Sequence, residues 1–165
     1  GGANEWARQI SDFLGAQCII TGAQLYTQPL LAVGLGCNRG CPVDSLLALL
    51  DETLESHGLR RHAVRALASI ELKQDELGLQ QLAEMLQLPI SFYSATVLNK
   101  YGDRLSRKSE IVFRETGCYG VAEAAALACA ERLINSSHRA ELLIAKRKNA
   151  DATLAVARIY GNPGA

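Results

Sequence analysis

The sequence predicts an α/β protein with three layers, in which helices cover both faces of a mixed, mostly parallel β-sheet. Short apolar runs alternate with amphipathic helical patterns through the middle of the chain. One run, at 30–35, is continuously apolar, as in strands buried in parallel sheets. Near the end, the segments 141–147 and 153–160 indicate a hairpin-like pair of strands. Together these patterns define the expected fold.

The first 28 residues are predicted to form a helix–strand segment with a linker, ahead of a main domain at 29–165. Asn4 suits an N-cap, and apolar residues then recur at helical spacing as far as Gly15. A short strand is expected at Cys18–Thr21, followed by a connector at 22–29 that ends in Pro29.

The main domain begins with the strand at 30–35, a loop at 36–42 and a helix that Gly58 ends. A strand at 64–70 leads to a helix that Asp75 could cap and that must end before Pro89. The remaining predicted elements are a strand at 90–93, a short turn capped by Ser94, a polar exposed loop or lid at 99–110, a short strand at 111–113, an alanine-rich helix at 121–134 and the two final strands.

Composition excludes several classes of function. Lys and Arg together number 17, as do Asp and Glu, and aromatic residues make up only 5% of the chain, so neither nucleic acid nor a membrane surface is an expected partner. No apolar run is long enough to span a bilayer, and the cytoplasm is the expected compartment. Five cysteines suit neither a disulfide framework nor a zinc site, so no metal is predicted.

The first candidate site is the glycine-rich segment Gly34–Gly40, which leaves a strand and enters a helix. Ligands of open α/β sheets bind at such strand ends. Arg39 stands where the dinucleotide fingerprint requires glycine, and the phosphate-loop signature is absent. A carboxylate or phosphate held by loop amides and Arg39 remains one interpretation, and a structural surface role for Arg39 is the other.

A second strand end, at Ala68–Leu79, carries Lys73 and Glu76 close to a helix start. Charges there often only cap or solubilise the helix. If the two strands are parallel neighbours, however, this segment and the loop at 36–40 open on the same edge of the sheet. Two polar loops on one edge favour a cleft there.

The third candidate is Thr116–Leu127, where Gly117 and Gly120 precede an apolar helix that carries one carboxylate, Glu123. A glycine-rich entry into a helix N-terminus can hold an anion. The competing interpretation is a turn followed by a core helix whose alanines allow close packing.

These segments, taken in order, resemble a known family. The motifs are Val33–Gly40, then Ala68–Ile70 with Lys73, Glu76 and Gly78–Leu79, then Leu88–Ile90 with Phe92–Ser94, and finally Thr116–Gly117 with Val121–Leu127. They resemble the CobE proteins of cobalamin biosynthesis and the C-terminal domain of CbiG, over about residues 30–160. Gly1–Glu5 and Leu14–Thr21 resemble the end of the CbiG N-terminal region, so 1–28 would be a remnant of it.

The resemblance implies a cobalamin (vitamin B12) pathway protein that binds a precorrin or corrin intermediate, such as hydrogenobyrinic acid. Other cobalamin-pathway enzymes are further candidate partners, and no cofactor is predicted. CbiG opens the lactone ring of cobalt-precorrin-5A and releases acetaldehyde, so a hydrolase is one alternative. A non-catalytic carrier or scaffold for pathway intermediates is another.

If the chain catalyses a reaction, Glu123 is the predicted catalytic residue, because a desolvated carboxylate among alanines suits a general acid or base. The competing interpretation is that Glu123 holds the amides of the loop at 36–40. Glycine-rich loops and cations would bind the carboxylates of the macrocycle. The predicted substrate-binding residues are Gly36, Cys37, Arg39, Gly40, Lys73, Glu76, Thr116, Gly117, Gly120 and Val121.

Overall fold

The computed structural model describes residues 18–21, 24–27, 30–133 and 140–159. Within the first two of these ranges, β1 (Cys18–Thr21) pairs antiparallel with β2 (Gln24–Thr27). The strand at β1 is therefore confirmed, whereas the connector expected at 22–29 contains a strand of its own. The helix predicted between Asn4 and Gly15 lies outside the described residues.

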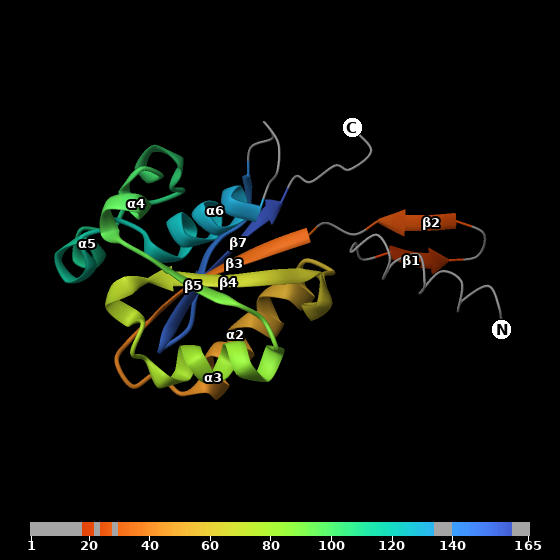
Figure 1. Cartoon of the computed structure of the whole chain (residues 1–165), viewed down its shortest axis with the longest axis horizontal. Coiled ribbons are helices and arrows are strands. Elements are labelled where there is room, and N and C mark those ends of the chain that lie inside the picture. The colour runs from red at the N-terminus through yellow and green to blue at the C-terminus, as the bar shows by residue number, and fades with distance from the viewer. Residues whose placement is uncertain (1–17, 22–23, 28–29, 134–139, 160–165) are drawn as a thin grey trace.

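The main domain is built on a five-stranded sheet with the order β5-β4-β3-β7-β6 (Figure 1). Its strands are β3 (Leu30–Cys37), β4 (Val64–Ile70), β5 (Ile90–Tyr93), β6 (Glu141–Lys148) and β7 (Ala152–Ile159). The pairs β3–β4 and β4–β5 are parallel, and β7 is antiparallel to both β3 and β6. Only β7 therefore runs against the other strands, and the mixed, mostly parallel sheet is confirmed.

Helices cover both faces of this sheet, as the sequence predicts (Figure 1). On one face lie α2 (Val43–Ser56) and α3 (Leu77–Leu86), and on the other α4 (Ala95–Asn99) and α6 (Val121–Leu133). Alternate residues of β3 serve the two layers: Leu31 and Val33 pack in the α2 layer, and Ala32 packs in the α6 layer. The single-turn helices η1 (Arg61–Ala63), η2 (Glu71–Lys73) and η3 (Gly102–Arg104) lie in the connections.

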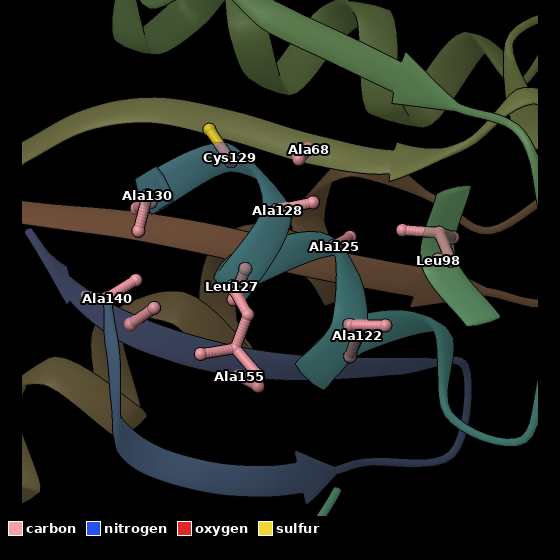
Figure 2. Close-up of a cluster of buried hydrophobic side chains, with 14 of the residues drawn as sticks. Ala68, Leu98, Ala122, Ala125, Leu127, Ala128, Cys129, Ala130, Ala140 and Ala155 are labelled. Atoms are coloured by element: carbon pink, nitrogen blue, oxygen red, sulfur yellow. The ribbon is translucent and has the colours of Figure 1, made fainter. Parts of the chain in front are cut away.

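Small residues bring α6 unusually close to the sheet. Its buried side chains are mostly alanines, and they face Ala68 of β4 and Ala155 of β7 (Figure 2). At Gly34 of β3, an added Cβ would lie 1.9 Å from the carbonyl oxygen of Ala122 and 2.5 Å from the amide nitrogen of Ala126. The backbone of α6 therefore rests directly on β3, which fixes where the helix begins.

The strand predicted at 111–113 is wrong, because these residues lie in the helix α5 (Glu110–Thr116). Three consecutive apolar residues suggested a strand, but the capping residues decide the outcome. The Ser109 hydroxyl accepts a hydrogen bond from the Val112 amide, and Gly117 ends the helix at a φ of 78°.

The polar segment at 99–110 is anchored rather than free. The Arg104 guanidinium pairs with the Glu131 carboxylate of α6 at 2.5 Å, and the Tyr101 hydroxyl donates to the same carboxylate at 2.8 Å. Arg104 also donates to the Ala140 carbonyl oxygen. These contacts tie η3 to α6, so the segment up to residue 104 belongs to the framework.

Candidate functional site

A cleft of about 770 Å³ opens at the carboxyl ends of β3 and β4, the edge at which α/β sheets bind ligands. Because β7 is antiparallel to β3, the turn between β6 and β7 lies at this edge as well. The N-terminus of α6 and one side of α5 complete the wall. The lining residues are Gly36–Arg39, Ile70, Leu72, Lys73, Val112, Glu115, Thr116, Gly120–Ala122, Lys146 and Lys148–Thr153.

The structure brings together the three segments that the sequence singles out. Of the predicted residues, those that line the cleft are Gly36, Cys37, Arg39, Lys73, Thr116, Gly120 and Val121. Gly40, Glu76, Gly117 and Glu123 do not line it. One cleft therefore joins all three segments, although four of the predicted residues lie outside its lining.

The cleft is locally cationic on a chain whose net charge is zero. Its lining contains four cationic side chains, those of Arg39, Lys73, Lys146 and Lys148, and two acidic ones. The carboxylate of Asp151 is held at the rim, where it accepts a hydrogen bond from the Ser45 hydroxyl at 2.7 Å. Among the described residues, no ion pair engages the three lysines. These ammonium groups are available to an anionic ligand.

Two carboxylates hold Arg39 and its loop beside the cleft. The Arg39 guanidinium lies 3.8 Å from the carboxylates of both Asp75 and Glu76. Glu76 is only 6% exposed and accepts a hydrogen bond from the Gly40 amide at 3.1 Å, so it fixes the loop at 36–40. Arg39 and Asp75 are both largely exposed, so that pair contributes little energy, and the pair with Glu76 is equally long at 3.8 Å. Its side chain is free to exchange these partners for a ligand.

Glu123 is buried in the first turn of α6, and its carboxylate accepts hydrogen bonds from two other segments, at Ser106 and at Lys146. One carboxylate oxygen accepts the Ser106 amide at 2.7 Å. The other accepts the Ser106 hydroxyl at 2.5 Å and the Lys146 amide at 2.8 Å. The expectation that Glu123 holds the loop at 36–40 is wrong, since Glu76 holds that loop. A catalytic role for Glu123 stays a prediction, and these contacts favour a structural one.

Cys37, which lines the cleft, and Cys118, which lies outside the lining, are both poor nucleophiles. Burial raises the pKa of Cys37 to about 12, and burial also raises the pKa of Cys118, so both thiols stay protonated near neutral pH. In the described ranges, no group of three or more His, Cys, Asp or Glu side chains could hold a metal ion. None of the helices in the same ranges is long and apolar enough to cross a bilayer.

The sequence did not predict that the β6–β7 hairpin forms one wall of the cleft. Lys146, Lys148 and the turn at 149–153 line the cleft, yet the hairpin was expected only as framework. The available signal was the pair of lysines at alternate positions next to a turn, which places both on one face of a strand. What the sequence did not indicate is that β7 pairs with β3.

This arrangement defines an α/β domain with a cleft at its strand ends whose lining is mainly cationic among its charged side chains. The chain belongs to the family described as "Cobalamin synthesis G C-terminus", which matches residues 31–157. It is therefore a cobalamin biosynthesis protein of the CobE/CbiG type, as the resemblance in its motifs implied. Residues 1–28, expected to be a remnant of the CbiG N-terminal region, lie outside that match.

Individual relatives support the same assignment. The chain is 38% identical to Protein CobE of Sinorhizobium sp over 77% of its own length and 79% of that protein. It is 34% identical to a cobalt-precorrin-5A hydrolase of Priestia megaterium over 87% of its own length but only 36% of the hydrolase. A crystal structure of CobE, a protein from the cobalamin (vitamin B12) biosynthetic pathway, superimposes with a TM-score of 0.75 at 49% identity, covering 81% of this chain and 93% of that one.

Proposed function

We propose that this chain binds a tetrapyrrole intermediate of cobalamin biosynthesis, a precorrin or a corrin, in the cleft at the ends of β3 and β4. The observation that carries the proposal is the cationic lining of a large cleft in a protein of the cobalamin pathway. Precorrins are broad macrocycles fringed with acetate and propionate groups. Each of these carboxylates is a partner for an ammonium or guanidinium group.

The size and the apolar groups of the cleft support the same ligand class. A volume of about 770 Å³ lies in the upper part of the usual range for small-molecule sites, about 300–1,000 Å³. Ile70, Leu72, Val112 and Val121 supply apolar surface for the face of a macrocycle. Leu72 is 47% exposed, so a ligand that covered it would remove apolar surface from water. Ammonium groups around such surface match a ring with an acidic rim.

The second candidate function is hydrolysis of a tetrapyrrole lactone of the cobalt-precorrin-5A type. The 34% identity to a cobalt-precorrin-5A hydrolase favours it. The chain spans 36% of that relative, and Glu123, the one predicted catalytic residue, lies outside the cleft lining. A carrier that releases its ligand unchanged would need only the cleft itself. We therefore rank binding without turnover first.

The proposal is tested by titrating the purified chain with hydrogenobyrinic acid and following the absorbance of the macrocycle. Binding should shift the spectrum and make the pigment co-elute with the protein. The variant Lys148→Ala should weaken binding, whereas Lys100→Ala should not, because Lys100 is exposed and lies outside the lining. An uncharged ester of the same macrocycle should bind more weakly than the acid. No spectral change and no co-elution with wild type would remove the proposal.

The hydrolase is tested separately. The chain is incubated with cobalt-precorrin-5A and the mixture is assayed for acetaldehyde. Release at a rate proportional to protein concentration would place the hydrolase first. Binding of the lactone without release would leave the binding function in place.

A further inference from the structure

Along β6, the regular alternation of side chains between the two faces of the sheet is interrupted. This interruption decides which side chains reach the cleft. Ile144 packs in the α2 layer, and Arg147 also points toward that layer, where its guanidinium donates to the Ser56 hydroxyl of α2 at 3.3 Å. Lys146 and Lys148 line the cleft. In a regular strand, residues two apart share a face, so Lys146 would lie on the same face as Ile144. It does not.

The pairing of β6 with β7 shifts register twice, between Leu142 and Ile144 and between Ile144 and Arg147, and the second shift, a β-bulge, causes this change of face. Ile144 pairs with Val156 and Arg147 with Leu154, so the step between these pairs is one residue longer on β6 than on β7. Such a bulge rotates the following side chains to the opposite face and leaves an amide without a partner in the ladder. A backbone amide without a partner in a half-buried position is destabilising. The bulge therefore needs an acceptor from outside the sheet.

Glu123 supplies that acceptor. Its buried carboxylate, in the first turn of α6, accepts a hydrogen bond from the Lys146 amide at 2.8 Å. Its position is fixed in turn by Ser106, which donates through both its amide and its hydroxyl. A carboxylate with three donors is a strong and directional anchor. Nothing in the cleft competes for it, since Glu123 is not part of the lining.

We propose that Glu123 is a positioning residue: it holds the bulge of β6 and so places the Lys146 ammonium in the cleft, where that group binds a carboxylate of the ligand. The part that concerns the ligand rests on the proposed function. The part that concerns Glu123 and the bulge does not, because it depends only on contacts within the chain.

The first experiment measures hydrogen exchange of the Lys146 amide by NMR in the unliganded protein. Since β6 lies at the edge of the sheet, an amide in its bulge should exchange rapidly unless a side chain accepts it. We expect the Lys146 amide of wild type to exchange at least about tenfold more slowly than a free edge amide. In Glu123→Gln its signal should shift and its protection should fall. An unprotected Lys146 amide in wild type overturns the proposal without any variant.

The second experiment is a double-mutant cycle on the affinity for hydrogenobyrinic acid. Lys146→Ala and Glu123→Gln should each weaken binding about tenfold, as expected for loss of one charge-assisted hydrogen bond. Combined, they should weaken binding no more than Lys146→Ala alone, because both remove the same contact. Lys73→Ala is the matched control: Lys73 lines the cleft from η2, outside β6, so its effect should add to that of Glu123→Gln.

The outcomes separate the two proposals. Equal losses from Glu123→Gln in the wild-type and Lys146→Ala backgrounds would show a general structural effect and overturn the positioning role. If wild type binds no macrocycle, the proposed function fails, and with it the ligand contact of Lys146. Hydrogen exchange then still decides whether Glu123 holds the bulge.

Discussion

Replacing Gly34 by alanine should destabilise the protein strongly, although alanine is the smallest possible addition. The new Cβ would lie 1.9 Å from the Ala122 carbonyl oxygen and 2.5 Å from the Ala126 amide nitrogen. Both are backbone atoms of α6, so no side-chain rotation relieves the overlap. The helix would have to move away from β3 by about 1.5 Å to reach normal contact.

The expected magnitude follows from opposing contributions. Overpacking of a close-packed interior typically costs about 1–3 kcal/mol and sometimes more. Removing a glycine from a strand returns about 0.5–1 kcal/mol of conformational entropy. Because α6 contacts β3, β4 and β7, a displacement would disturb a large part of one core layer. We therefore place the overpacking cost above its typical range, at about 3–5 kcal/mol, which leaves a net loss of about 2–4 kcal/mol in the free energy of unfolding.

The assay is urea denaturation followed by circular dichroism, with thermal unfolding as a second measurement. A loss of this size corresponds to a fall in Tm of about 10 °C for a domain of this length. Gly102→Ala is the control, since an added Cβ there meets nothing within 4 Å and its φ is not positive. It should change the stability by less than about 0.5 kcal/mol. A loss below about 1 kcal/mol for Gly34→Ala would refute the close contact of α6 with β3.

The remaining predictions concern charge, pH and backbone strain. Lys148→Ala should lower both the affinity for hydrogenobyrinic acid and the steepness of its salt dependence, and an unchanged salt dependence in the titration would argue against a contact with the ligand. Burial raises the pKa of Cys37 from 9.0 to about 12 and that of Cys129 from 9.0 to about 11. The thiols of the unfolded chain therefore ionise at lower pH than those of the folded protein, and the urea concentration at the unfolding midpoint should fall as the pH is raised from 9 toward 12. Replacing both by alanine should flatten that fall, and an equally steep fall would contradict it. Gly40→Ala should cost about 1–2 kcal/mol from its φ of 75° alone, with no steric overlap, whereas a loss as small as that of Gly102→Ala would show that the loop adapts.

Local signals in the sequence were sufficient for most of the main domain. The apolar run at 30–35 and the alternation of strand and helix led to the central layers, which depend on burial patterns that are visible in single segments. The helix α5 was missed because Ile111–Phe113 has strand-like side chains. Its capping residues, Ser109 and Gly117, outweigh that preference. Capping is local as well, so this error was avoidable.

The site was only partly predictable, for a topological reason. Loops after parallel strands were expected to meet at one edge, and Gly36 and Lys73 do line one cleft. Lys146 and Lys148 were missed because their place depends on β7 pairing antiparallel with β3 and on a bulge in β6. Neither feature can be recognised from a pattern within a short stretch of sequence. The partners of Glu123 were mistaken for the same reason, since they come from two distant segments.

The position of β7 at the interior of the sheet has a consequence for biosynthesis of the protein. Leu30 at the start of β3 pairs with Ile159 at the end of β7, so the first and last strands of the main domain are direct neighbours. While the ribosome is still making Ala152–Ile159, the apolar β3 has an open edge, and β6 has no neighbour at all. Contacts this distant in sequence slow folding. The sheet can therefore close only after β7 has been synthesised, and until then the edge of β3 that β7 covers stays open.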